Sequence, residues 1–222
     1  MTDTHDAPAG PAGVRDWDDP EHARHYLAQE TLPHRAEGEA VLVDALGPLV
    51  TRVLDLGAGD GRVLACVLEA HPGAEGVALD HNPAMLDALR ERFAAGRVDV
   101  VDHDFALPLP TTEGTFDAVV SALAIHHLDV TRRTQLYGEV RGLLRPGGVF
   151  ADLDLVRSPT EVLHDRFIER VPWSRHPERD WDRHPSLAER LEWTAEAGFV
   201  NVDCLWKWRE LALVVGELPI SA

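Results

Sequence analysis

The sequence contains few cysteines, since only Cys66 and Cys204 occur among its 222 residues. The two lie far apart in the chain. They offer neither the paired spacing of a cysteine metal site nor the framework of a disulfide-rich secreted domain. We therefore expect a protein of the reducing cytoplasm.

Long hydrophobic runs are absent as well, because no segment reaches the roughly eighteen consecutive apolar residues that a membrane span requires. The first sixteen residues are rich in Ala, Gly, Pro and Asp and lack the basic start and apolar centre of a signal peptide. These features predict a disordered tail over residues 1–16 and a soluble protein that does not insert into a membrane.

Basic residues are scarce relative to acidic ones. The chain has 21 Lys and Arg against 38 Asp and Glu, which gives a formal net charge of -17. Such a charge opposes approach to the phosphate backbone of nucleic acids, so the composition disfavours a nucleic-acid partner. Acidity of this kind is also typical of a well-solvated surface, and alone it selects no substrate.

Alternation of short strand-like runs with longer helical runs is typical of an α/β domain, and the length suits one such domain. We expect strands over residues 52–56, 76–79, 98–101, 116–121, 149–155, 199–208 and 211–218. We expect helices over residues 19–32, 35–46, 61–70, 83–95, 131–144 and 187–197.

Turn residues between these runs indicate how the chain is organised. The sequence Arg145-Pro146-Gly147-Gly148 is expected to end a helix before the fifth strand, and Arg209-Glu210 is expected to turn the last two strands into an antiparallel hairpin. The fold class predicted is α/β, a doubly wound, seven-stranded and mostly parallel sheet with an antiparallel hairpin at one edge.

Three parts of the chain are expected. They are the tail over residues 1–16, an N-terminal helical lid over 17–50, and an α/β ligand-binding domain over 51–222 that carries a small helical cap at about 157–186.

The segment over residues 53–62 is the most informative of the chain. An apolar strand runs into a loop with Gly57, Gly59 and Gly61, bracketed by Asp55 and Asp60. Acidic side chains here would repel the pyrophosphate that a dinucleotide loop binds, and the G-x-G-x-x-G spacing is absent. A ligand with positive charge and hydroxyl groups but no phosphate fits better. S-adenosylmethionine, with its ammonium, sulfonium and ribose diol, has these properties.

Five segments occur together in the order and spacing of one known family: residues 53–62, 76–86, 102–107, 116–128 and 144–154. On these motifs the chain resembles the class I S-adenosylmethionine-dependent methyltransferases, in particular the small bacterial type 11/12 group. The resemblance extends over roughly residues 53–218 and implies the Rossmann-like fold of that family.

The resemblance also implies a set of cofactor contacts. Asp80, at the end of the second strand, is expected to accept the ribose hydroxyls, although NAD enzymes place an acid similarly. Asp104 and Phe105 are expected at the adenine, and Met85 either packs on its other face or belongs to the core. The expected cofactor-binding residues are Tyr26, Asp55, Gly57, Ala58, Gly59, Asp80, His81, Met85, Asp104, Phe105, Ser121 and Ala122.

His126 and His127 are the candidate catalytic residues, because the segment after the fourth strand faces the transferred methyl group in proteins of this type. Histidine titrates near neutral pH and suits a general base. Adjacent helical residues point about 100° apart, so at most one is expected to face the ligand, and both could be structural. Methyl transfer depends mainly on positioning, so a base is not obligatory.

The lid and cap supply further candidates. Tyr26 is expected to fold over the cofactor, and the cap residues His164, Trp173 and Trp181 are expected to contact the acceptor. No H-E-x-x-H motif or comparable signature joins the histidines, so no catalytic metal is expected. Trp206 and Trp208 alternate on one strand and should share one face in the core.

These features predict an enzyme that moves a methyl group from S-adenosylmethionine to an oxygen, nitrogen or carbon atom of a small molecule. The acidic composition favours a neutral or cationic acceptor, and the oligomeric state expected is a monomer or homodimer. Three alternatives stay open: an enzyme of the same fold that uses a modified S-adenosylmethionine in tRNA base modification, a non-catalytic cofactor-binding module, and an NAD(P) oxidoreductase.

Overall fold

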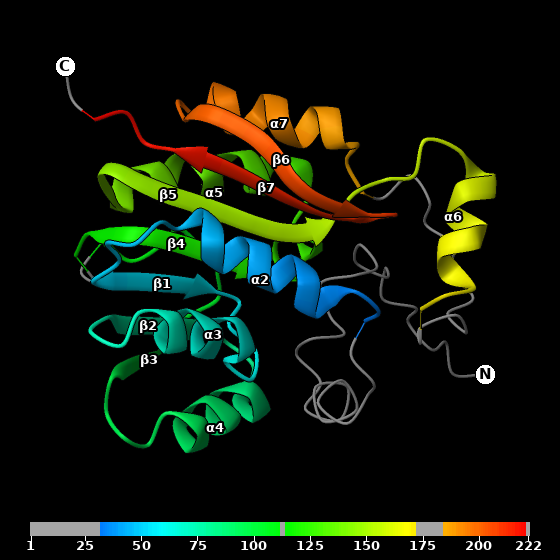
Figure 1. Cartoon of the computed structure of the whole chain (residues 1–222). Coiled ribbons are helices and arrows are strands. Elements are labelled where there is room, and N and C mark those ends of the chain that lie inside the picture. Colours follow the sequence, from blue (N-terminus) through cyan, green and yellow to red (C-terminus); the bar gives the residue numbers. More distant parts are fainter. Residues whose placement is uncertain (1–31, 112–113, 172–183, 221–222) are drawn as a thin grey trace, which may run out of the picture.

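A seven-stranded sheet organises the chain in the order β3-β2-β1-β4-β5-β7-β6 (Figure 1). The structure is a computed structural model that describes residues 32–111, 114–171 and 184–220. Its strands are β1 (Arg52–Leu56), β2 (Glu75–Asp80), β3 (Val98–Asp102), β4 (Phe116–Ala122), β5 (Leu144–Leu155), β6 (Val200–Trp208) and β7 (Leu211–Glu217). Its helices are α2 (Arg35–Ala45), α3 (Arg62–Ala70), α4 (Pro83–Arg92), the short 3-10 helix η3 (Ile125–His127), α5 (Val130–Leu143), α6 (Glu161–Ile168) and α7 (Leu187–Glu196).

Strands β1 to β5 are parallel, so their carboxyl ends meet at one edge of the sheet. The strand order reverses between β1 and β4, which is where open α/β sheets bind ligands. Strand β7 runs antiparallel to both β5 and β6. The predicted hairpin at the sheet edge is therefore confirmed, with β6 outermost.

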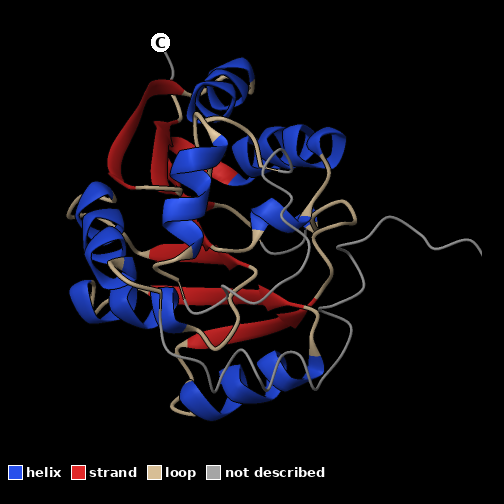
Figure 2. Cartoon of the chain, turned by 90° about the vertical axis from the view of Figure 1, so that its right-hand side faces the viewer, coloured by secondary structure: helices blue, strands red, loops and turns tan. Residues whose placement is uncertain are grey.

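Helices cover both faces of the sheet, as Figures 1 and 2 show. On one face α2, α3 and α4 pack on a core that includes Leu42, Val53 and Leu64. On the other face α5 packs on a second core that includes Leu54 and Phe150. Because both faces are covered, the last four residues of β1 are all buried, and they read as a continuous apolar run interrupted by Asp55.

The predicted elements inside the described residues are present, most with ends within one residue. Helix α4 ends at Arg92 rather than at residue 95. The larger error concerns β5, which begins at Leu144, directly after α5, rather than at residue 149. Leu144 has extended backbone angles and pairs with Phe116, and the register shifts before Ala118 pairs with Val149. Pairing between strands thus outweighs the local Pro-Gly-Gly signal.

Several sequence-based expectations concern residues outside the described ranges, namely the tail over 1–16, the helix over 19–32, and part of the cap. Within the lid region, α2 packs on the sheet: Gly38 lies against Trp206, and both Trp206 and Trp208 pack on the same core, as expected. Helix α6 of the cap lies beyond the carboxyl ends of the strands (Figure 1). Among the described helices, none has the length and apolar character to cross a bilayer.

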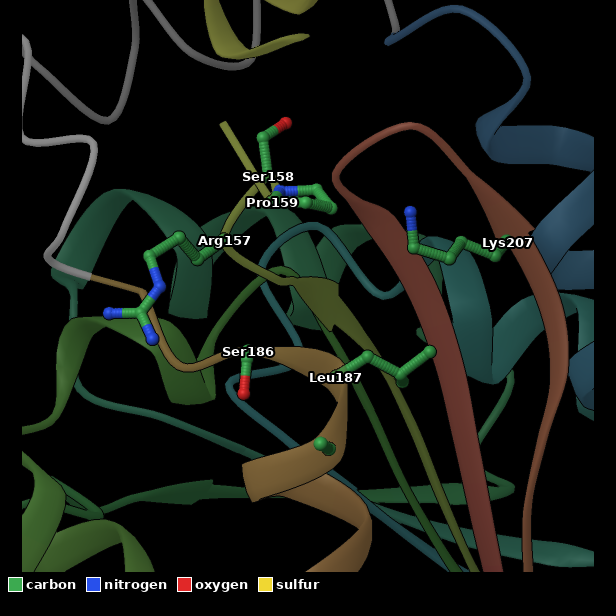
Figure 3. Close-up of a pocket in the computed structure, with 7 residues that line it drawn as sticks. Arg157, Ser158, Pro159, Ser186, Leu187 and Lys207 are labelled. Carbon is green, nitrogen blue, oxygen red and sulfur yellow. The ribbon is translucent and has the colours of Figure 1, made fainter. Parts of the chain in front are cut away.

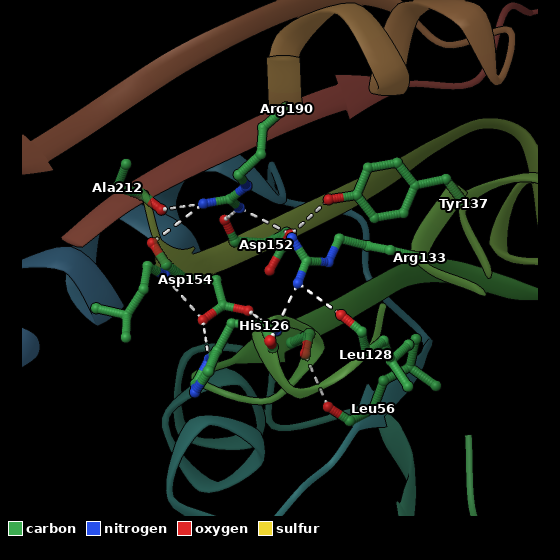
Figure 4. Close-up of polar contacts among 11 residues, drawn as sticks. Leu56, His126, Leu128, Arg133, Tyr137, Asp152, Asp154, Arg190 and Ala212 are labelled. Atoms are coloured by element: carbon green, nitrogen blue, oxygen red, sulfur yellow. Dashed lines mark hydrogen bonds and ion pairs between the residues drawn. The ribbon is translucent and has the colours of Figure 1, made fainter. Parts of the chain in front are cut away.

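A buried ion pair ties α7 to the sheet (Figure 4). Arg190 is 2% exposed, and its guanidinium lies 2.7 Å from the Asp152 carboxylate of β5. It also donates to the carbonyl oxygens of Asp152, Asp154 and Ala212, while the Tyr137 hydroxyl donates to Asp152 over 3.0 Å. One arginine thus satisfies the polar groups of two strands inside the core.

Replacing Arg190 with Met should lower the free energy of unfolding by about 3–5 kcal/mol, because it leaves the Asp152 carboxylate buried without its cation. Urea unfolding of the purified chain measures this. Combining Arg190→Met with Asp152→Asn should recover part of the loss, since the uncompensated charge is then gone. Equal losses in the single and double variants would mean that the pair is not what stabilises this layer.

Candidate functional site

The glycine loop after β1 lies at the switch point and approaches the segment after β4. Gly57, Gly59 and Gly61 have φ angles of 65°, 57° and 77°, values that side-chain-bearing residues rarely adopt. A Cβ atom on Gly57 would stand 2.4 Å from the Cβ of Ala124. The Ala58 amide donates to the carbonyl of Leu79 over 3.0 Å, which fixes the loop to β2.

Asp80 ends β2 and organises the neighbouring turn. Its carboxylate accepts hydrogen bonds from the amides of Gly59, His81 and Asn82 over 2.8–2.9 Å. Burial raises the pKa of Asp80 overall, although these hydrogen bonds act in the opposite direction. Asp80 thus links the glycine loop to the start of α4, where Asn82 caps the helix.

Asp55 lies beneath the glycine loop and is 1% exposed. Its Oδ2 atom accepts no hydrogen bond from the residues that the structure describes. Burial raises the pKa of Asp55 from 3.8 to about 8; a hydrogen bond from the Leu64 backbone and the charge of Arg35 oppose this rise, whereas Asp80 and Asp60 add to it. An unsatisfied carboxyl oxygen under a bare backbone loop is suited to a cationic ligand.

The segment after β3 lies against the same loop. The Phe105 ring is buried and would be 3.1 Å from a Cβ on Gly57, and Asp104 accepts a hydrogen bond from the Ala106 amide over 2.8 Å. Arg132 of α5 donates to the carbonyl oxygens of Phe105 and Leu107 and so holds the segment in place.

Three other predicted cofactor residues serve the packing of the fold. The Ser121 hydroxyl is fully buried and donates to the Leu56 carbonyl over 2.9 Å, which joins β4 to β1 beneath the loop. Met85 is 1% exposed, and Ala122 is half-buried at the end of β4. Their proposed contacts with a cofactor stay predictions.

His126 on η3 is paired with Asp154 at the end of β5 (Figure 4). The His126 Nδ1 atom lies 2.5 Å from Asp154 Oδ1, and the His126 amide donates to Oδ2 over 2.8 Å. Burial alone would raise the pKa of Asp154, but His126 and Arg190 hold it below its ordinary range. Asp154 is therefore an anion, which can only accept, so His126 donates to it through Nδ1 and Nε2 is the ring nitrogen left to exchange a proton with a ligand.

Neighbouring side chains fix the position of η3. Arg133 of α5 donates to the carbonyl oxygens of His126 and Leu128. The His127 ring lies 3.9 Å from the His126 ring. The His184 ring lies 5.5 Å from the His126 ring and meets it edge-on. The His126 side chain is only 13% exposed, and this supported ring is the best-placed titratable group at the site.

The remaining candidates are placed differently or not described. His164 on α6 is buried and pairs through Nδ1 with Glu210 in the β6–β7 turn, at 2.9 Å. Tyr26, Trp173 and Trp181 lie outside the described residues. Within the described ranges, no three His, Cys, Asp or Glu side chains gather as a metal site would require.

Sequence reasoning missed Asp154, Asp152 and Arg190. The available signal was two acidic residues, Asp152 and Asp154, at alternate positions of an otherwise apolar strand. Acidic side chains on one face of a buried strand need partners, and this pattern alone marks them for attention.

Comparison with known proteins finds similarity to methyltransferases. Residues 53–148 match a family model described as a methyltransferase domain. An uncharacterized methyltransferase of Mycobacterium tuberculosis is 35% identical over 116 residues, which cover 52% of this chain and 56% of the relative. A ubiquinone/menaquinone biosynthesis C-methyltransferase of Paracoccus denitrificans is 29% identical over 185 residues, covering 75% of this chain and 71% of the relative.

Solved structures confirm the fold. The 1,6-didemethyltoxoflavin-N1-methyltransferase of Burkholderia thailandensis, with bound 1,6-didemethyltoxoflavin and S-adenosylhomocysteine, superposes with a TM-score of 0.65 at 23% identity, covering 97% of this chain and 93% of that one. The chain spans about half the length of the first curated relatives that it matches.

Asp55→Asn should change how stability depends on pH. Between about pH 4 and pH 8 the folded state keeps a proton on Asp55 that the unfolded state has already released. The contribution of this proton to stability is therefore complete below about pH 4 and is lost as the pH rises to about 8. Relative to the wild type, the Asn variant should gain up to about 1.4 kcal/mol per pH unit across this window.

Urea unfolding at three pH values between about 5 and 8 measures the difference. Asp60→Asn is the matched control, because Asp60 is partly exposed and paired with Arg92. Its pH slope should follow the wild type. If Asp55→Asn also follows the wild type, Asp55 is ionised in the folded protein at neutral pH.

Proposed function

We propose that this chain is a class I S-adenosylmethionine-dependent methyltransferase, which its match to a methyltransferase domain and its fold support, and that it methylates a small-molecule acceptor with His126 as general base. The observation that carries the proposal is the His126–Asp154 pair on the segment that touches the glycine loop. The acceptor atom is an oxygen, nitrogen or carbon that loses a proton, and the enzyme is cytoplasmic.

The residues around the loop fit the cofactor. The unsatisfied Oδ2 of Asp55 suits a cationic ligand, and the bare face of Gly57 and Gly59 lets a ligand approach the backbone closely. In this proposal Asp80 receives the ribose hydroxyls and Asp104 the adenine amine. When bound, S-adenosylmethionine supplies an electrophilic methyl group for in-line displacement from a sulfonium.

The chain's own residues then have three tasks. The glycine loop and Asp80 orient the donor, and holding two reactants in near-attack geometry is worth roughly 7–11 kcal/mol. His126 Nε2 accepts the proton that the acceptor atom loses. Asp154 keeps the ring in this tautomer and stabilises the imidazolium that forms.

His164, Trp173 and Trp181 of the cap remain the proposed acceptor contacts, and Tyr26 the proposed lid residue. We propose a monomer or homodimer that acts without a nucleic-acid partner. The tRNA-modifying, non-catalytic and NAD(P)-dependent alternatives make different predictions in the two experiments below.

Asp80→Ala should weaken binding of S-adenosylhomocysteine by about 1–3 kcal/mol, because a buried charge-assisted hydrogen bond is lost. Isothermal titration calorimetry measures the affinity. Asp99→Ala, which removes an exposed carboxylate of β3, is the control and should bind as the wild type does. Unchanged binding by Asp80→Ala would exclude the ribose contact, and thermal stabilisation by NADPH instead of S-adenosylhomocysteine would overturn the cofactor assignment.

A library of small molecules is first screened for an acceptor that gains a labelled methyl group. With that acceptor, Asp154→Asn should lower kcat by about 10²–10⁴-fold, because the amide no longer enforces the Nδ1–H tautomer of His126. Cofactor affinity should stay unchanged. The loss should be smaller for acceptors whose nucleophile is already ionised, since these need no base. His126→Gln should behave in the same way.

Tyr137→Phe is the matched control, because it removes a hydrogen bond to Asp152 in the same buried layer without touching His126. It should keep wild-type kcat. A wild-type rate in both Asp154→Asn and His126→Gln would remove the base from the mechanism. Cofactor binding without any labelled acceptor would favour the non-catalytic module.

A further inference from the structure

A cavity of about 490 Å³ opens between the segment after β5 and the start of α7, beside β6 (Figure 3). Its walls include Arg157, Pro159, Leu187, Ala188 and Lys207. In Figure 3, Lys207 and Arg157 flank the space from opposite sides, with Leu187 below. This volume lies within the range of sites that bind small organic molecules.

The cavity adjoins the proposed catalytic site along two paths. Asp154, the partner of His126, precedes Arg157 by three residues, which is at most about 11 Å of extended chain. On the other wall, His184 lies 5.5 Å from His126 and precedes Ser186, the cap of α7, by two residues. A few residues on each of these two walls therefore connect the cavity to the His126–Asp154 pair.

Lys207 gives the cavity a positive charge. It is the only lysine among the 222 residues, against 20 arginines. Its side chain is exposed at the mouth of the cavity, and its ammonium donates to the Arg209 carbonyl. Among the residues that the structure describes, no carboxylate lies within ion-pair distance of it. Glu210, the nearest acid on the same hairpin, is paired with His164.

Burial lowers the pKa of Lys207, which means that its ammonium lacks full solvation in the free protein. An anion beside it would reverse this effect. Arg157, in contrast, already has a partner, because its guanidinium lies 3.3 Å from Glu189. Arg157 and Lys207 are the charged side chains of the cavity lining, and Glu189 pairs with the first of them.

The start of α7 adds to this field. Ser186 and Glu189 form a capping box, and the first helical residues, Leu187 and Ala188, line the cavity. Amide groups at these positions have no acceptor within a helix, and the helix dipole is positive there. The walls contributed by Pro159 and Leu187 are apolar. A ligand that matches both features has an anionic group on an apolar body.

We propose that this cavity binds an anionic group, a carboxylate or a phosphate, of the methyl acceptor, with Lys207 as its counter-charge. The proposal rests on the proposed function only in naming the acceptor as the source of the anion. It replaces the expectation of a neutral or cationic acceptor, which came from the charge of the whole chain and not from the charge of the site.

Because Lys207 is the only lysine, its chemical modification reports directly on the cavity. The full chain is treated with an uncharged amine reagent, the N-hydroxysuccinimide ester of acetic acid, and modification of Lys207 is followed by mass spectrometry. Benzoate at ten times its Kd should slow modification about tenfold. The α-amino group of the polypeptide should react at an unchanged rate.

Two further ligands test which chemical group protects Lys207. Benzamide has the shape of benzoate without its charge and should give no protection. Inorganic phosphate should protect if the cavity prefers a phosphate, and benzoate should protect more strongly if it prefers an aromatic carboxylate. Equal modification rates with and without both anions would overturn the proposal.

Variants test the charge itself. Lys207→Met should weaken benzoate binding, measured by calorimetry, about tenfold or more, and Lys207→Arg should restore most of it. Arg209→Met removes a positive charge from the same hairpin outside the cavity lining and should bind as the wild type does. Equal weakening by Lys207→Met and Arg209→Met would mean that only the general charge of the hairpin matters, which also overturns the proposal.

Failure of the anion site can be told apart from failure of the proposed methyltransferase function. Protection of Lys207 by an anion needs neither donor nor turnover, so it can succeed when no methylated product forms. Conversely, once an acceptor is found, Lys207→Met should raise KM for a carboxylate-bearing acceptor and leave KM for its methyl ester unchanged. An equal change for both would show that the anion of the acceptor does not bind here.

Discussion

The rest of the structure depends on how β5 accommodates two buried carboxylates. Asp152 and Asp154 lie on one face of a central strand, where an unpaired charge would cost several kcal/mol. Arg190 from α7 neutralises the first, and His126 from η3 engages the second. Each pairing fixes an element that the hydrophobic core alone would leave free to shift, so satisfaction of these charges determines both where α7 docks and how the proposed base is oriented.

A second constraint operates under the glycine loop. Burying Asp55 without a partner for Oδ2 raises its pKa to about 8, so the free protein stores an unfavourable carboxyl group where a cationic donor is proposed to bind. Replacing Asp55 with a neutral residue should make the free protein more stable at alkaline pH and the site less suited to its ligand. Strain that a ligand relieves is a common feature of binding sites, and here it is confined to one side chain.

The sequence allowed prediction of most of the fold because most signals were local. Alternating runs, the cap at Asn82 and the turn at Arg209 each act over a few residues. The start of β5 at Leu144 was mispredicted because Pro146 and the following glycines suggest a break, whereas pairing with Phe116 depends on a strand far away in the sequence. The candidate site likewise contains residues that a local motif identifies and residues that only the topology brings together.

Among the site residues, the glycine loop and Asp80 belong to a contiguous motif and were identified from the sequence. The contact between His126 and Asp154 joins residues 28 positions apart, so no local pattern reveals it. Asp154 could be seen only as an acid in an apolar strand, and its partner only after the topology set η3 at the end of β4 beside β5.

The net charge of the chain likewise does not predict the charge of a ligand. A total of -17 describes the surface as a whole and governs long-range encounter, which salt screens beyond about 10 Å. Binding depends instead on the charges within a few ångströms of the ligand. At the cavity beside β6, Lys207 and the start of α7 supply the positive field of the proposed anion site, and Glu189 is already paired with Arg157. An acidic protein can therefore select an anionic ligand, provided that its few unpaired cations are concentrated where the ligand binds.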